Sequence, residues 1–182
     1  QNNEKLLITT LTMAGRSAAK MEFKEQIQKG NVAIFYNPLE FDFLFSKFII
    51  KHAPKFCVIL ECDLWPVMIS SIKRAKLPLV FAQAQYPEKG FNRDKKFPFV
   101  RGNLIEKFDM ILAKSIKHVR RFEFFNGKKI SIMGDTRFEQ TIPVSQLKRS
   151  ISFKEKYLNN YFTVCFASVG KREDVIIVEV IK

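Results

Sequence analysis

The sequence has little of what marks a membrane-spanning, exported or metal-binding protein. No apolar run approaches the roughly 20 residues that a membrane-spanning helix needs, and no basic and apolar leader stands before Gln1. We therefore expect neither a membrane span nor an export signal. Cys57, Cys62 and Cys165 lack the paired CxxC spacing of a zinc or redox site. Their apolar neighbours predict reduced core residues of a cytoplasmic protein.

Common catalytic and phosphate-binding patterns are also missing. His52 and His118 are isolated, at neither metal nor triad spacing, so neither is expected to be a ligand or a general base. The glycine and lysine pattern of a Walker loop does not occur. We expect no metal and no cofactor.

Positive charge is abundant. Lys and Arg number 31 against 18 Asp and Glu, which gives a net charge of +13. A field of that sign concentrates phosphates, nucleic acid or acidic lipid headgroups without choosing among them, and biased composition is an equal explanation. Because no nucleic-acid-binding motif is present, nucleic acid is not an expected partner.

The length of 182 residues, with 47% hydrophobic and 27% charged residues, fits one folded domain and at most part of another. Apolar runs rich in β-branched or aromatic residues alternate with stretches of helical spacing. This alternation predicts an α/β, Rossmann-like parallel sheet with helices on both faces. The expected strands are Leu6–Thr10, Val32–Tyr36, Phe56–Leu60, Leu79–Ala82, Met110–Ala113, Ile130–Met133 and Phe162–Ala167, and the expected helices are Ala18–Ile27, Phe41–Lys51, Pro66–Arg74, Phe99–Lys107 and Ile116–Phe125.

The predicted organisation has three parts. Residues 1–142 form the Rossmann-like domain, and the polar, basic stretch 143–160 is a linker or a crossing helix. Residues 161–182 begin a second domain, where Lys171–Lys182 is either a helix or, given its β-branched residues, a strand. Ser115 is expected to cap the helix that follows it, and Gly127 to end that helix.

Ligands of an open parallel sheet bind beyond the carboxyl ends of its strands. The residues that directly follow the expected strands are therefore the candidate site: Thr10–Gly15, Asn37–Glu40, Glu61–Pro66, Gln83–Gly90, Lys114–Ser115, Gly134–Glu139 and Ser168–Glu173.

Two of these segments have both a functional and a structural explanation. Glu61 and Asp63 can accept hydrogen bonds from a ligand, or one of them can cap the helix beginning at Pro66 while Trp65 fills the core. The spacing alone favours the structural explanation. The turn from Thr9 to Gly15 suits an anion at a helix N-terminus, but a capped helix explains it equally well.

A basic stretch with interleaved phenylalanines follows the fourth expected strand. Such a surface can hold phosphates and contact acyl chains, although a charge run is often only a solvated face. Its cations are Lys89, Arg93, Lys95, Lys96 and Arg101.

Taken in order, these segments resemble the Kdo transferases. The segment Glu61-Cys62-Asp63-Leu64-Trp65-Pro66 is similar to the Glu-Thr-Glu-Leu-Trp-Pro motif of that family. Leu7–Gly15 is similar to the family's threonine-rich turn, and Tyr36–Glu40 stands where the family has Pro-x-Asp. Arg121-Phe122 resembles the family's later Arg-Phe, and Gly134–Glu139 resembles Gly-Asn-x-Lys-Phe-Asp.

The resemblance implies the N-terminal, acceptor-side domain of a GT-B glycosyltransferase that transfers Kdo from CMP-Kdo to a lipid A precursor in lipopolysaccharide biosynthesis. It places the protein in the cytoplasm, at the inner face of the inner membrane, in peripheral contact with anionic lipid. The family's catalytic base, a Glu in a Gly-Glu turn, would precede Gln1. The implied site residues are Glu61, Asp63, Thr10, Thr12 and Gly15 for the acceptor, and Gly134, Arg137, Ser168 and Glu173 for the cleft on the donor side.

Departures from the family pattern leave a second function open. Gln83-Ala84-Gln85-Tyr86-Pro87 stands where the family has Asn-Ala-Arg-x-Ser, so a cation is lost. Ala167–Glu173 stands where the family has Ala-Ser-Thr-His-x-Gly-Glu, without the His. A catalytically inactive relative that binds anionic glycolipids or phosphates is the alternative.

Overall fold

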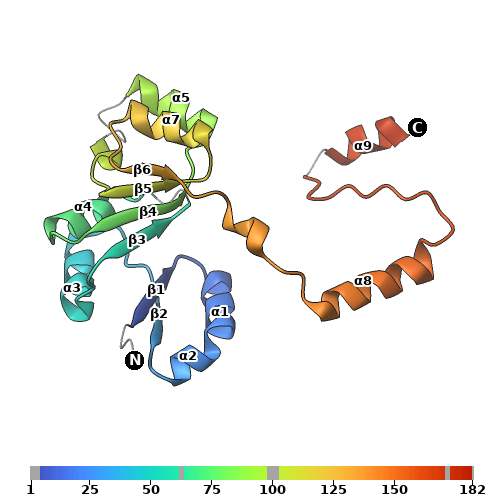
Figure 1. Ribbon diagram of the computed structural model, residues 1–182, viewed down its shortest axis with the longest axis horizontal. Helices are drawn as coiled ribbons and strands as arrows, with labels where there is room; N and C mark the ends of the chain where they lie inside the picture. Colours follow the sequence, from blue (N-terminus) through green and yellow to red (C-terminus); the bar gives the residue numbers. More distant parts are fainter. Residues whose placement is uncertain (1–4, 62–63, 98–102, 171–172, 182) are drawn as a thin grey trace. The chain divides into compact units, whose positions relative to one another are not determined.

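The computed structural model describes residues 5–61, 64–97, 103–170 and 173–181. The chain divides into two compact units, residues 1–136 and 137–182. Figure 1 shows the first unit as strands and helices in alternation, and the second as helices joined by extended chain.

The first unit begins with a two-stranded parallel sheet. Strand β1 (Leu6–Thr10) pairs with β2 (Val32–Tyr36) from Leu6 opposite Val32 to Thr10 opposite Tyr36. Helices α1 (Met13–Glu22) and α2 (Lys24–Gln28) connect the two strands. Both predicted strands are confirmed, whereas the stretch predicted as the single helix Ala18–Ile27 is covered by two helices, the first of which begins at Met13.

Four further strands form a second parallel sheet in the order β3-β4-β5-β6. Strand β4 lies inside this sheet and is buried at five of its six positions, as its continuous apolar run predicts. On β3, by contrast, only Ile59 is buried, and Val58 and Leu60 are exposed. The strands are β3 (Cys57–Leu60), β4 (Leu79–Ala84), β5 (Met110–Ala113) and β6 (Ile130–Ile132).

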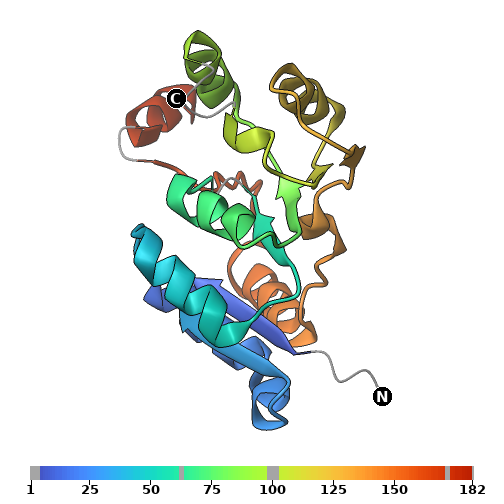
Figure 2. The ribbon, with the colours of Figure 1, turned by 90° about the vertical axis from the view of Figure 1, so that its left-hand side faces the viewer.

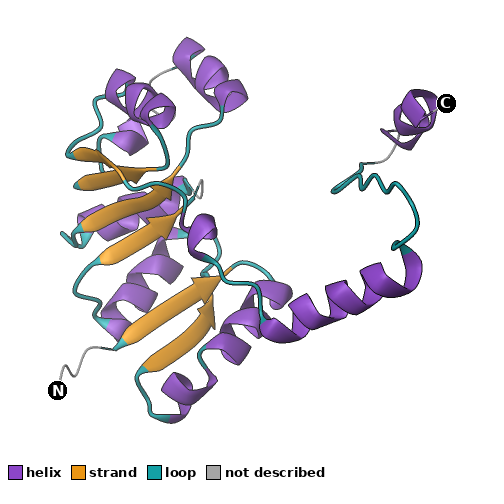
Figure 3. Cartoon of the chain, turned by 45° about the vertical axis from the view of Figure 1, so that its right-hand side comes forward, coloured by secondary structure: helices purple, strands orange, loops and turns teal. Residues whose placement is uncertain are grey.

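Helices connect these strands as crossovers. Helix α3 (Asp42–His52) precedes β3, and α4 (Pro66–Arg74) connects β3 to β4. These two helices pack side by side, as Figure 2 shows. Helix α7 (Ile116–Phe124) connects β5 to β6. Figure 3 shows helices and strands alternating along the first unit.

The core of the first unit lies between the four-stranded sheet and its helices. Phe81 on β4 stacks on Phe108 at a ring-centroid distance of 4.9 Å and meets Phe122 of α7 edge-on at 5.6 Å. All three rings are fully buried. Aromatic burial of this kind supplies a large part of the stability of a small domain.

Helix α5 (Glu88–Lys96) was not among the predicted helices, and its contacts explain why it forms. Its sequence contains Gly90 and has little apolar periodicity, so its own helix propensity is poor. Asp94 is buried and accepts a hydrogen bond of 2.9 Å from the Tyr86 hydroxyl. Phe91 also meets the Tyr86 ring edge-on. Contacts with Tyr86 therefore stabilise the helix, and the sequence pattern of the helix itself does not predict it.

The ends of α7 differ in detail from their prediction. Ser115 is the N-cap residue, but its side chain makes no capping bond. The left-handed residue after the helix is Asn126, with φ of 54°, rather than Gly127. A Cβ at Gly127 would lie 3.0 Å from Ile111 Cδ1, Ile130 Cδ1 and the Phe122 carbonyl oxygen. Gly127 is thus needed for close packing, not for its backbone conformation.

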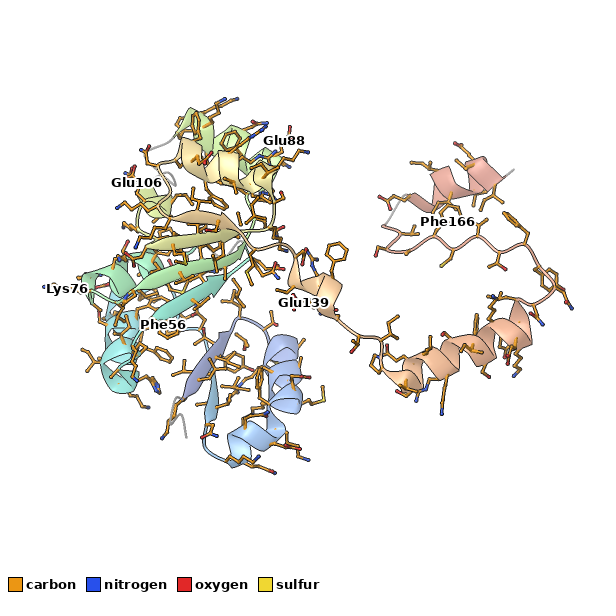
Figure 4. The ribbon with its side chains drawn as sticks, viewed as in Figure 1. Phe56, Lys76, Glu88, Glu106, Glu139 and Phe166 are labelled. Carbon is orange, nitrogen blue, oxygen red and sulfur yellow. The ribbon has the colours of Figure 1, made fainter. Side chains whose placement is uncertain are left out.

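The second unit contains the 3-10 helix η1 (Thr136–Glu139) from Arg137 onward, with α8 (Val144–Tyr157) and α9 (Glu173–Ile181). Residues 144–157 take the helical alternative that the sequence left open, and so do residues 173–181. Phe166, labelled in Figure 4, belongs to this unit. Its described residues include no buried side chain.

Three predictions are wrong. Phe162–Ala167 is not a strand, because these residues are exposed and no described strand pairs with them. The single predicted sheet is two separately hydrogen-bonded sheets. Cys165 is exposed instead of buried, while Cys57 is partly buried and both are free thiols. Cys62, Asp63 and Arg101 lie outside the described residues, as does the start of the predicted helix Phe99–Lys107.

Candidate functional site

Charged side chains meet beyond the carboxyl ends of three strands of the four-stranded sheet. Glu61 follows β3, Lys114 follows β5, and Asp135 lies beyond β6. Lys114 Nζ lies 3.3 Å from Glu61 Oε1 and 3.4 Å from Asp135 Oδ2. The lysine side chain is only 7% exposed, whereas the Glu61 side chain is 51% exposed. One buried cation therefore sits between two carboxylates, of which Glu61 faces solvent.

Polar contacts from β4 complete this group. Gln83 Nε2 donates a hydrogen bond to Thr136 Oγ1, and its Oε1 is buried without a hydrogen-bond partner among the described residues. The backbone N–H of Gln85 donates to the Glu61 carbonyl at 3.1 Å. We call the five residues whose side chains gather here the strand-end cluster: Glu61, Gln83, Lys114, Asp135 and Thr136.

Two members of the strand-end cluster have a strained backbone. Glu61 has φ of 64° and Gln83 has φ of 52°, in the left-handed region that favours glycine. A non-glycine residue there costs on the order of 1–3 kcal/mol and persists where the surrounding structure enforces it, often at a functional site. With this backbone conformation the Glu61 carboxylate meets Lys114.

The capping role considered for Glu61 belongs to another residue. Glu40, in the loop after β2, accepts hydrogen bonds from the N–H groups of Val67 at 3.0 Å and Met68 at 3.2 Å, at the start of α4. Trp65 is 38% exposed and is not core filler. The structural explanation of this segment is therefore wrong for Glu61 and Trp65, and it leaves the Glu61 carboxylate available to a ligand.

The threonine-rich turn gives the opposite result. Thr12 is the N-cap of α1, and its hydroxyl accepts a hydrogen bond of 3.0 Å from Gly15 N–H. The capped-helix explanation is confirmed for these two residues. Thr10, at the end of β1, keeps a buried hydroxyl oxygen with no hydrogen-bond partner among the described residues. Close by, the Arg16 guanidinium lies 4.5 Å from the centre of the Tyr36 ring.

The predicted basic face lies on α5, where Lys89, Lys95 and Lys96 are exposed. Lys95 Nζ lies 5.3 Å from the ring centre of Phe124 and 5.7 Å from that of Phe91. Arg93 forms an ion pair of 2.7 Å with the buried Asp94, so its charge is partly neutralised. The described part of this face therefore presents three lysine charges to solvent, and the fourth cation, Arg93, is paired with Asp94.

The loop between β4 and α5 is anchored to α7. The Tyr86 N–H donates to His118 Nδ1 at 3.0 Å, and Arg121 donates to the Tyr86 carbonyl at 2.6 Å and to Glu88 at 3.2 Å. Glu88 is labelled in Figure 4. Burial lowers the pKa of His118 below its ordinary value, so the ring is neutral at pH 7 and accepts this hydrogen bond. His118 is thus a structural residue, which agrees with its isolation in the sequence.

The predicted residues of the donor-side cleft fall mostly in the second unit, which contains Arg137, Ser168 and Glu173. Glu173 accepts a hydrogen bond of 2.8 Å from Gly170 N–H at the start of α9, and Ser168 has φ of 59°. Gly134, in the first unit, has φ of 85° and so needs the freedom of glycine. Their assignment to a cleft stays a prediction.

Two general features of the described residues bear on the kind of site. No group of three or more His, Cys, Asp or Glu side chains among them could hold a metal ion. None of the helices in the described part of the chain is both long and apolar enough to cross a bilayer. The strand-end cluster itself contains two carboxylates, an amide, a hydroxyl and a buried ammonium.

Parallel strands flanked by helices, with polar side chains gathered after the strands, define an α/β domain of the Rossmann-like class, and the predicted fold class is confirmed. This is the architecture of the N-terminal domain of a GT-B glycosyltransferase. The chain belongs to the family of 3-deoxy-D-manno-octulosonic-acid transferases (kdotransferases), whose family model matches residues 1–140. The resemblance drawn from the motifs is thereby confirmed.

Individual relatives are distant and longer. The chain is 19% identical to a 3-deoxy-D-manno-octulosonic acid transferase of Bordetella pertussis over 97% of its own length and 41% of the relative. It is 23% identical to one of Haemophilus influenzae over 96% of its length and 40% of the relative. A bifunctional glycosyltransferase/methyltransferase of Fusobacterium nucleatum is 21% identical over the whole chain and 28% of the relative. The chain thus spans well under half the length of these relatives.

The strand-end segments predicted from the sequence contain every member of the strand-end cluster, within Glu61–Pro66, Gln83–Gly90, Lys114–Ser115 and Gly134–Glu139. Of the five, the sequence singles out only Glu61 as a site residue. Gln83 is the penultimate residue of β4, Lys114 directly follows β5, and Asp135 and Thr136 lie shortly after β6, so position along the chain is the signal that selects them. What the sequence does not supply is the pairing: Lys114 and Glu61 are 53 residues apart, and only the strand order brings them together.

Proposed function

We propose that this chain is the acceptor-side domain of a glycosyltransferase that moves Kdo from CMP-Kdo to a lipid A precursor. The observation that carries the proposal is the Glu61 carboxylate, half-exposed and fixed beyond β3 by its ion pair with Lys114. It stands in the segment that resembles the most specific motif of the family to which the chain belongs. An ionised carboxylate so placed can accept hydrogen bonds from sugar hydroxyls.

In this proposal the domain binds and orients the acceptor. A base outside this stretch removes a proton from an acceptor hydroxyl, the oxygen attacks the anomeric carbon of Kdo, and CMP leaves. Orientation by a fixed carboxylate raises the rate because it holds the hydroxyl in the attacking geometry. We expect the transfer to need no metal, so addition of EDTA should leave its rate unchanged.

The finer proposal concerns where the protein works. Exposed Lys89, Lys95 and Lys96 on α5 lie near Phe97, which is 56% exposed. Cations beside an exposed ring suit the surface of an anionic bilayer, each lysine adding about 1 kcal/mol of attraction near that surface. We therefore propose peripheral binding at the cytoplasmic face of the inner membrane, where a lipid A precursor would be presented.

Vesicle co-sedimentation tests the membrane proposal. Lys95→Glu/Lys96→Glu should weaken binding to vesicles that contain phosphatidylglycerol at least about tenfold, because two charges are reversed. Lys24→Glu/Lys29→Glu, at the ends of α2, is the matched control and should bind nearly as the unaltered protein does. Equal loss in both variants would show that net charge alone, and not this face, attracts the protein.

A second candidate is a non-catalytic glycolipid-binding module. Gln85 stands where the family has an Arg, and Gly170-Lys171 stands where it has a His followed by another residue, so two polar contacts differ. This candidate predicts binding of the acceptor without transfer.

A transfer assay separates the two candidates. The complete gene product that contains this sequence is incubated with CMP-Kdo and a tetra-acylated lipid A precursor, and the lipid is analysed by mass spectrometry. The transferase proposal predicts a product heavier by one or more Kdo residues. Unmodified lipid, with acceptor binding intact, would contradict it and favour the binding module.

A further inference from the structure

The function proposed above uses Lys114 only as the ion-pair partner of Glu61, and Lys114 is the most enclosed charge in the strand-end cluster. Its side chain is 7% exposed, compared with 51% for Glu61 and 20% for Asp135. Burying an ammonium is costly unless carboxylates compensate for the lost hydration. The two carboxylates at 3.3 and 3.4 Å provide that compensation.

The two carboxylates that flank Lys114 differ in their exposure to solvent. Asp135 is largely enclosed, so it acts as the inner partner of the cation, whereas half of the Glu61 side chain stays open to solvent. Glu61 also keeps a left-handed backbone, with φ of 64°. An exposed glutamate normally samples several rotamers, and a fixed cation at one of its oxygens restricts that freedom. Among the described residues, no hydrogen bond is made to the other oxygen, Oε2, which can accept one.

The sequence of this cluster departs from the family pattern in a related way. An Arg of the family is replaced by Gln85, whose backbone N–H bonds to the Glu61 carbonyl. An Asn of the family is replaced by Asp135, which pairs with Lys114. Compared with the family pattern, a cation is therefore absent after β4, at Gln85, and a carboxylate is added at Asp135, where it pairs with Lys114.

We propose that Lys114 is a positioning residue of the acceptor site: it holds Glu61 in the orientation that accepts a hydroxyl hydrogen bond from the acceptor sugar, and Asp135 holds Lys114 in turn. This inference rests on the proposed function for the identity of the acceptor. In this proposal the ammonium of Lys114 orients Glu61 and does not contact the reacting atoms.

The test uses a variant that preserves the charge of the cluster. Lys114→Met/Asp135→Asn removes one positive and one negative charge, so the three residues keep their net charge of −1 and the fold is spared an unpaired buried ion. The proposal predicts an unfolding midpoint close to that of the unaltered protein and acceptor binding weakened about tenfold or more. Lys114→Arg, which keeps the cation, should restore most of the binding. Lys20→Met on α1, an exposed lysine, is the control.

Binding is measured by calorimetry on the complete gene product, with a soluble bisphosphorylated glucosamine disaccharide as the probe, and transfer is measured separately. Weak binding by Lys114→Met/Asp135→Asn with a normal midpoint supports the role of Lys114 even if the unaltered protein transfers no Kdo, in which case only the proposed function fails. Binding equal to that of the unaltered protein overturns the role of Lys114. An unaltered protein that does not bind the disaccharide overturns it as well.

Discussion

At the scale of single residues, the packing at Gly127 gives the sharpest prediction. An added methyl group would lie 3.0 Å from the Phe122 carbonyl oxygen and from two isoleucine Cδ1 atoms. The backbone oxygen cannot move without disturbing the end of α7. We expect Gly127→Ala to lower the free energy of unfolding by about 1–3 kcal/mol, the usual cost of overpacking a core.

Gly90→Ala is the matched control for this change. Gly90 lies inside α5, and a Cβ there would approach the Tyr86 ring no closer than 3.8 Å. Because alanine is the better helix former, this variant should gain about 0.5–1 kcal/mol. Urea unfolding of both variants decides the matter, and a Gly127→Ala protein as stable as the original would contradict the packing described for this turn.

At the scale of elements, α4 depends on a carboxylate from a distant loop. Glu40 accepts the N–H groups of Val67 and Met68 and places a negative charge at the positive end of the helix. Glu40→Ala should therefore cost about 1–2 kcal/mol of stability, in the range of lost helix caps. Glu40→Gln keeps an acceptor without the charge and should lose less. Thermal unfolding checks the order, and equal stability of all three proteins would exclude the capping role.

Strand β4 has a comparable support at its beginning. Asp109 accepts hydrogen bonds from the Leu79 N–H at 2.8 Å and from Lys73 Nζ. The hydrogen bond from Lys73, with that from Leu79, lowers the pKa of Asp109 below its ordinary value. A carboxyl group with a lowered pKa stabilises the fold above its unfolded pKa of about 3.9, and this contribution is lost as pH falls through the folded value.

The prediction for Asp109→Asn follows from the lowered pKa of Asp109, which stabilises the fold at neutral pH. The variant should be less stable than the original protein at pH 7, by about 1 kcal/mol given its half-exposed side chain. The difference should shrink as pH falls below the unfolded pKa of about 3.9 and through the lowered folded pKa of Asp109. Unfolding curves across this range measure it. A difference that stays constant with pH would show that the charge of Asp109 plays no part.

How far the sequence predicts these elements depends on where their stability comes from. Strands such as Met110–Ala113 and the helix Pro66–Arg74 have the predicted bounds, because apolar runs and a first-turn proline determine them locally. Helix α5 escapes prediction because Asp94 and Tyr86 hold it through a tertiary hydrogen bond. Phe162–Ala167 has the composition of a strand, but strand formation also needs a neighbour to pair with.

At the scale of the whole molecule, the candidate site follows the same division. The carboxyl-end rule for parallel sheets selects the correct loops, and Glu61 is among them. The partner of Glu61 is Lys114, and the cap of α4 is Glu40, and neither relation can be inferred from spacing along the chain. The strand order of the four-stranded sheet creates the first contact, and the approach of the loop after β2 to the start of α4 creates the second. The site is therefore a property of the four-stranded sheet as a unit, and its central residue is the exposed carboxylate of Glu61.

The most direct measurement of this account is the transfer rate of Glu61→Gln in the complete gene product. The substitution keeps the size of the side chain and removes the negative charge of the carboxylate, which accepts a hydrogen bond from a hydroxyl of the acceptor sugar. We predict that kcat/KM falls by about tenfold to a hundredfold, the loss expected for one hydrogen bond to a charged group. Glu88→Gln, on the exposed start of α5, should retain most of the rate. A Glu61→Gln protein that transfers Kdo as fast as the unaltered one would contradict the central claim.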